Sequence, residues 1–160
     1  MKSLWTAQAR RRRGVTLVES AIAVPILLMV LFAIFDVSRL IYSHFAIQHA
    51  VREGARFAVT GRRLADPGNP GSFFTRRDSI VQKVIEQAEP FVTLHTAAVT
   101  LTSTTGGPNS AGGPGDLVTV RVIHKVSLLT PFSVFFPNDE VVFNIASVFK
   151  NEPFPSSFTN

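Results

Sequence analysis

The sequence predicts an α+β protein: a long N-terminal transmembrane helix extends into a small head that holds an antiparallel sheet and one further helix. Three features predict this class. Residues 15–35 form an apolar run, residues 36–60 continue in helical rhythm, and short segments with alternating apolar residues follow after residue 97. The expected divisions are a basic leader at 1–14, a transmembrane helix at 15–35, a helix extension at 36–60 and an extracytoplasmic α+β domain at 61–160.

The basic charge of the chain is concentrated at its N-terminus. Of the 16 Lys and Arg residues, Lys2 and Arg10 to Arg13 lie within residues 1–14. The rest of the chain has 11 basic and 11 acidic side chains, so its net charge is zero. A neutral remainder does not favour nucleic-acid binding. The chain has no cysteine, which excludes disulfides and thiolate metal sites.

The apolar run VTLVESAIAVPILLMVLFAIF, residues 15–35, contains one charged residue, Glu19. About 20 apolar residues cross a hydrocarbon core as a helix, and the preceding arginines place the N-terminus in the cytoplasm. Pro25 is tolerated in such a helix and predicts a mild kink. A cleaved secretory signal is disfavoured, because the only Ala-x-Ala within the apolar run, residues 21–23, lies at its start and not at its end.

The stretch RRRRGVTLVES, residues 10–20, resembles the site that a prepilin peptidase cuts in type IV pilins and pseudopilins. Cleavage after Gly14 would make Val15 the new N-terminus and Glu19 its fifth residue. The resemblance implies that Glu19 pairs with the freed amino group of a neighbouring subunit during assembly. An intramembrane carboxylate is indeed expected to face a partner rather than lipid. The alternative is a plain membrane anchor with a coincidental spacing of Gly14 and Glu19.

Residues 13–56 resemble the N-terminal domain of TadE-like proteins, components of the tight-adherence (Tad) pilus system. The residues that carry the resemblance are Gly14, Val18, Glu19, Pro25, Asp36, Arg39, Ala50, Arg52, Glu53, Gly54, Ala55 and Arg56. It implies a pilin-like minor pilin or pseudopilin of the bacterial cytoplasmic membrane, with its head outside, placed in the filament or at its base. The implied partners are the membrane, other pilins and pseudopilins, Tad assembly platform proteins and a prepilin peptidase.

Beyond the membrane, the helix carries small residues every four positions, at Ala46, Ala50, Gly54 and Ala58. Small side chains let another backbone approach closely, so this stripe is expected to pack against another element. The charges of Arg52, Glu53 and Arg56 suit either a solvated face or an interaction surface.

A loop at residues 60–72 ends the long helix and leads into the outer domain. Apolar spacing predicts a helix at 76–89, ended by Pro90, and alternation predicts strands at 98–103, 117–126 and 140–149. The Gly-rich segment 103–116 is expected to be a mobile hairpin loop. The Phe-rich segment 128–139 either folds under the sheet or forms an exposed apolar patch.

The sequence predicts no enzyme, with no catalytic residue, metal ligand, cofactor or small-molecule substrate. Its histidines, His44, His49, His95 and His124, fit no metal-binding or catalytic spacing. Two other hypotheses remain beside the pseudopilin. One is an uncleaved single-pass anchor whose outer domain binds an envelope component. The other, a membrane-tethered enzyme, requires a clustered polar pocket in the head, which the sequence does not indicate.

Overall fold

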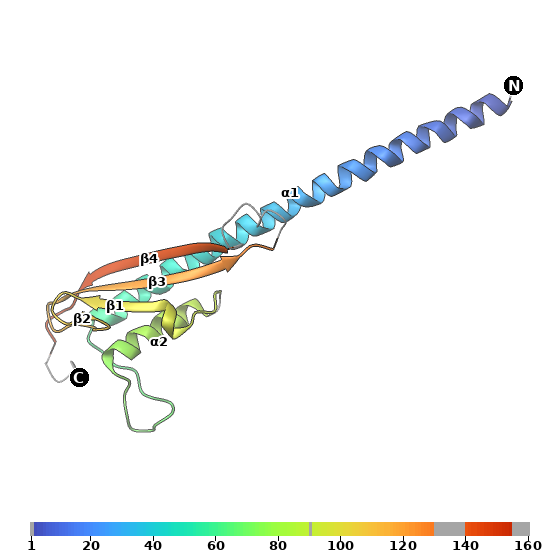
Figure 1. Ribbon diagram of the computed structural model, residues 1–160. Coiled ribbons are helices and arrows are strands. Elements are labelled where there is room, and N and C mark those ends of the chain that lie inside the picture. The colour runs from blue at the N-terminus through green and yellow to red at the C-terminus, as the bar shows by residue number, and fades with distance from the viewer. Residues whose placement is uncertain (1, 90, 130–139, 155–160) are drawn as a thin grey trace.

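The computed structural model describes residues 2–89, 91–129 and 140–154, with side chains from Thr16 onward. A rod formed by one long helix projects from a small head (Figure 1). The predicted α+β class, with a long helix, a second helix and an antiparallel sheet, is confirmed. The elements in chain order are α1 (Lys2–Val59), α2 (Arg76–Ala88), a 3-10 turn (Thr96–Ala98), β1 (Val99–Ser103), β2 (Gly107–Pro108), β3 (Leu117–Ser127) and β4 (Glu140–Lys150).

Helix α1 is longer than the sequence analysis predicts. It has 58 residues and passes through Pro25 without interruption, so it is roughly 87 Å long at ~1.5 Å per residue. The structure extends the helix to Lys2, so residues 2–14 of the expected leader are helical as well. Residues 2–13 contain no glycine or proline and are rich in good helix formers, so nothing in them stops a helix.

The C-terminal end of α1 is a glycine turn. Thr60 N donates to Phe57 O at 3.2 Å and Gly61 N donates to Ala58 O at 3.1 Å, which satisfies two of the last carbonyls. Gly61 has φ 69°, in the left-handed region that glycine adopts without strain. The turn sends the chain back along the head towards α2.

The sheet is antiparallel with strand order β2-β1-β3-β4. In its register, Leu101 of β1 lies opposite Val120 of β3, and Val122 of β3 lies opposite Ile145 of β4. The three predicted strands agree with β1, β3 and β4 to within one residue. Strand β2 lies inside the predicted loop 103–116, where two residues are too few to produce an alternating pattern.

Helices α1 and α2 cover one face of the sheet, α1 over β3 and β4 and α2 beside β1 (Figure 1). The β1 and β3 residues on this face are buried, and they meet apolar side chains from both helices. The core includes Ile47, Ala50, Val51, Ile80, Val81, Val84, Val99, Leu101, Val118, Val120 and Val122. The outward face of β4 is exposed, while its inward residues are half-buried.

Helix α2 begins where a side chain can cap it. Thr75 Oγ1 accepts a hydrogen bond from Asp78 N at 3.1 Å and donates to Asp78 Oδ2 at 2.6 Å. The helix ends at Ala88, one residue before the predicted end. Most of the Phe-rich segment predicted at 128–139 lies outside the described residues.

Candidate functional site

The part of α1 that projects from the head has an apolar surface. The apolar window of this helix is wholly unburied, and among the described residues it is the one candidate membrane span. Its exposed side chains include Leu17, Ile22, Ile26, Met29 and Phe32. A fully exposed apolar rod of this length is unfavourable in water but matches the hydrocarbon core of a bilayer. The finding supports a single-pass membrane protein.

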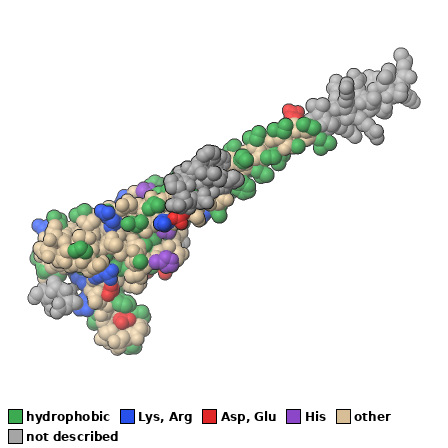
Figure 2. All heavy atoms as spheres, viewed as in Figure 1, with side chains coloured by type: hydrophobic (Ala, Val, Ile, Leu, Met, Phe, Trp, Pro, Cys, Tyr) green, Lys and Arg blue, Asp and Glu red, His purple; other side chains and the backbone are tan. Residues whose placement is uncertain are grey.

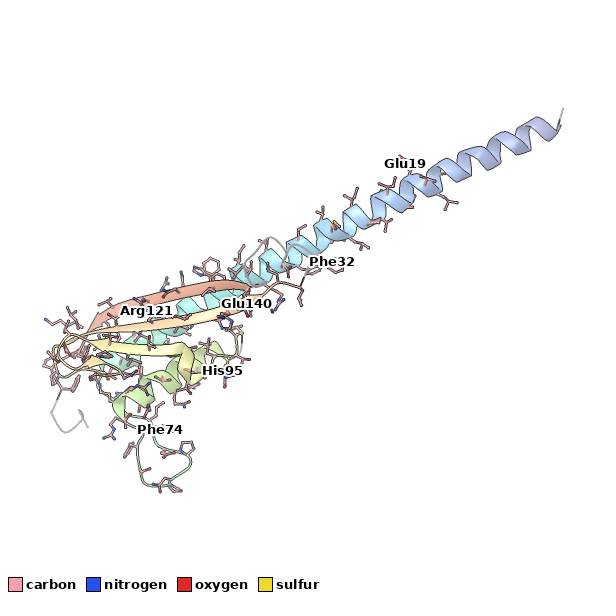
Figure 3. The ribbon with its side chains drawn as sticks, in the orientation of Figure 1. Glu19, Phe32, Phe74, His95, Arg121 and Glu140 are labelled. Carbon is pink, nitrogen blue, oxygen red and sulfur yellow. The ribbon has the colours of Figure 1, made fainter. Side chains whose placement is uncertain are left out.

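Glu19 is the one acidic side chain on this apolar rod, and it is exposed (Figure 3). Within the described side chains, no basic group lies within 4.0 Å of its carboxylate. The residues of the predicted processing site, Gly14 and Val15, lie inside α1. Glu19 therefore lies on the projecting part of α1, away from the head, and Gly14 and Val15 precede it on the same helix.

The small-residue stripe lies in the core of the head. Ala46, Ala50, Gly54 and Ala58 are all buried. At Gly54 the neighbour is α2, since a Cβ atom there would lie 2.3 Å from Val84 Cγ2. The element that approaches the stripe at this point is a helix of the same chain.

The charged residues of the family motif mostly face solvent. Arg52 Nη2 donates to Gln48 Oε1 at 3.3 Å, and Arg56 lies 3.7 Å from Glu53. Both arginines are exposed, so the contacts are surface contacts of small energetic weight.

Asp36 differs from the other motif charges because it is only 6% exposed. Its Oδ1 accepts a hydrogen bond from Leu129 N at 3.2 Å, which ties the segment after β3 to the rod. Arg39, one turn later, is exposed at the base of the head. The predicted motif step from Asp36 to Arg39 thus marks the junction of rod and head.

Arg76 at the start of α2 was missed by the sequence analysis. It is 3% exposed, and its Nη2 donates to Ala58 O at 3.0 Å and to Asn151 Oδ1 at 2.7 Å. Its Nη1 donates to the carbonyls of Ala111, at 2.9 Å, and Gly112. One guanidinium thus connects the end of α1, the loop before β3 and the segment after β4.

Contacts of Phe154 and Asn151 complete this cluster around Arg76. The Phe154 ring lies 4.4 Å from the guanidinium carbon. Asn151 Nδ2 donates to Ala111 O at 3.1 Å and to Gly113 O at 2.8 Å. Burial lowers the pKa of Arg76, and the negative charge of Asp116 opposes that shift. In sequence, Arg76 stands in a polar RRD stretch that gives no signal of burial.

The loop between β1 and β3 is organised by Asp116. Side-chain hydrogen bonds from Thr104 and Thr105 lower the pKa of this carboxyl to about 2. Thr105 Oγ1 donates to Oδ2 at 2.6 Å and Leu117 N donates to Oδ1 at 3.0 Å. The segment predicted as a mobile hairpin loop is therefore held by hydrogen bonds to an ionised aspartate.

The histidines do not gather into a site in the part of the chain that the structure describes. His44 packs 5.3 Å from the Phe143 ring, while His49 and His95 are exposed. His124 is half-buried, and desolvation lowers its pKa. Over the described ranges, no group of three or more His, Asp or Glu side chains could hold a metal ion.

The family model of TadE-like proteins matches residues 14–56, which confirms the resemblance seen at residues 13–56. TadE-like proteins are a pilus-associated family and not an enzyme family. No curated protein and no solved structure matches the chain. The matched range runs along α1 from the predicted processing site into the core of the head.

Proposed function

We propose, from the TadE-like match of residues 14–56, that this chain is a minor pilin or pseudopilin of the tight-adherence pilus system. It acts in pilus assembly or anchoring at the bacterial cytoplasmic membrane. The observation that carries the proposal is that the matched residues form one continuous helix. The apolar part of that helix is exposed for a membrane or for other helices, and its outer part is buried in the head.

The proposed topology follows from the positive charges that precede the apolar run. Arg10 to Arg13 precede the run, and the positive-inside rule keeps them in the cytoplasm. The head then lies outside the cytoplasm. Cleavage after Gly14 removes all of the excess positive charge, so the mature helix no longer has the flank that set its orientation. Such a helix can be drawn into an assembly more readily than an anchored one.

The first test of this function is the mature N-terminus. We expect intact-mass and N-terminal peptide measurements on the membrane fraction to find a chain that begins at Val15. Gly14→Val should keep the leader, because the glycine of the junction is replaced by a branched residue. In cells without the peptidase, the full-length chain should accumulate. A chain that begins at Met1 in the presence of active peptidase would contradict processing and favour the uncleaved anchor with an envelope-binding domain.

The second test concerns Glu19. In the mature chain its carboxylate pairs with the freed N-terminal amino group of a neighbouring subunit, where the low dielectric strengthens an ion pair. Glu19→Gln should reduce co-purification of those subunits about tenfold or more, since charge-assisted hydrogen bonds contribute roughly 1.5–3 kcal/mol. Glu86→Gln, on the surface of α2 beside Lys83, is the control and should leave co-purification unchanged. Equal recovery of complexes from Glu19→Gln and from unmodified protein contradicts this role.

A further inference from the structure

A polar pocket of about 390 Å³ lies between the base of the head and α1. Tyr42 and Phe91 form an edge-to-face pair in its wall, with their ring centroids 5.4 Å apart. No carboxylate lines the pocket among the described residues. Its lining consists of Arg39, Tyr42, Ser43, Phe91, Val92, Thr93, His124, Lys125, Val126 and Ser127.

A second hollow, an apolar groove of about 580 Å³, runs along the projecting part of α1. Arg39 lines both this groove and the polar pocket, so the two hollows meet at one cationic side chain. The remaining lining of the groove consists of Pro25, Leu28, Met29, Phe32, Phe35, Asp36 and Leu129. Phe32 is labelled on the rod in Figure 3, between the head and Glu19.

The depth of Arg39 in a bilayer follows from the helix geometry. It lies four residues beyond Phe35, the last residue of the apolar run, or about 6 Å farther along the axis. If residues 15–35 span the hydrocarbon core, Arg39 lies at the level of the lipid headgroups. Tyr42 lies one turn higher, and aromatic side chains are enriched at that interface.

Among the residues that the structure describes, no carboxylate forms an ion pair with Arg39. Lys125 Nζ already pairs with Glu140 Oε2 at 3.0 Å. For Arg39, no described carboxylate lies within 4.0 Å, while Asp36 accepts a hydrogen bond from Leu129 N. Blue, red and purple side chains gather on the head where it meets the rod (Figure 2). An exposed guanidinium beside hydroxyl groups, with the groove below it, is complementary to a phosphate that carries an acyl chain.

We propose that Arg39 binds the phosphodiester of an anionic phospholipid, with the headgroup in the polar pocket and one acyl chain in the apolar groove. An anionic lipid fits better than a zwitterionic one, because the pocket offers no described carboxylate to an amine. Such a lipid joins the base of the head to the membrane surface. This inference rests on the proposed membrane topology but not on cleavage or on Glu19.

The test uses full-length protein in nanodiscs made from equal parts of phosphatidylglycerol and phosphatidylcholine. After mild detergent extraction, native mass spectrometry counts the lipids that stay bound. We expect Arg39→Gln to reduce the enrichment of phosphatidylglycerol about fivefold, the weight of one basic residue at an anionic surface. Arg39→Lys should keep most of it. Arg52→Gln is the matched control, since Arg52 is exposed on the same helix about 20 Å farther from the membrane.

Three outcomes overturn the proposal. Equal enrichment in Arg39→Gln and unmodified protein means that only bulk lipid surrounds the rod. Displacement of phosphatidylglycerol by millimolar inorganic phosphate identifies a free-phosphate site instead. Release of the chain from membranes by alkaline carbonate removes both this inference and the proposed topology. The N-terminus is determined in the same sample, so a mature chain without lipid enrichment rejects the lipid site and leaves the proposed function standing.

Discussion

Gly54→Leu is expected to destabilise the head by about 3 kcal/mol or more, because the two helices leave no room for a side chain at this position. Even a Cβ atom would lie 2.3 Å from Val84 Cγ2, so α1 and α2 must separate to accommodate leucine. The gain in helix propensity over glycine, roughly 1 kcal/mol, does not offset that cost. Urea unfolding of the full-length protein in detergent, followed by circular dichroism, measures the change.

A double-mutant cycle separates this close contact from a general effect of the substitution. Gly54→Ala alone adds the colliding Cβ, and Val84→Ala removes the methyl groups that it meets. The two together should destabilise less than the sum of the single variants, by at least about 1 kcal/mol. Changes in unfolding free energy that add to within roughly 0.5 kcal/mol would show that the helices do not touch there.

Arg76→Met is expected to lower the free energy of unfolding by about 3 kcal/mol or more, since it removes four hydrogen bonds that a buried cation donates. The guanidinium donates to the carbonyls of Ala58, Ala111 and Gly112 and to the Asn151 side chain. Methionine fills much of the same volume but can donate to none of them. The segment after β4 should also become sensitive to proteases. The measurements are urea unfolding and limited proteolysis of the full-length protein.

A cation elsewhere on α2 provides the matched control for Arg76. Lys83 pairs with Glu86 at 3.0 Å on the surface of the helix, so Lys83→Met should change the stability by less than about 1 kcal/mol. If Arg76→Met and Lys83→Met unfold at the same urea concentration, the buried hydrogen bonds do not stabilise the head.

Secondary structure with strong periodicity was predictable from the sequence. The apolar run is long because a bilayer core requires it, and the strands alternate because one face of the sheet is buried. Val118, Val120 and Val122 are all fully buried as the alternation predicts. The processing motif at Gly14 does not predict where α1 begins, because the residues before Gly14 are themselves good helix formers.

Some features of the candidate site can likewise be recognised in the sequence, whereas others are visible only in the structure. The motif from Gly14 to Arg56 can be recognised in the sequence, and it is also the range of the family match. The burial of Asp36 cannot be recognised in the sequence, because it depends on a contact with Leu129, which is far away along the chain. Arg39 likewise appears as one more motif charge until the structure places it between a polar pocket and an apolar groove.

The sequence by itself determined the local features of this protein: the apolar length of α1, the alternation of the strands and the motif along the helix. The tertiary structure alone decided which partners those features meet. In the folded chain, Val84 occupies the space beside Gly54, and the Arg76 side chain contacts the end of α1. The physical reason is that periodicity and propensity act over neighbouring residues, whereas burial of Arg76 depends on Asn151, 75 positions away.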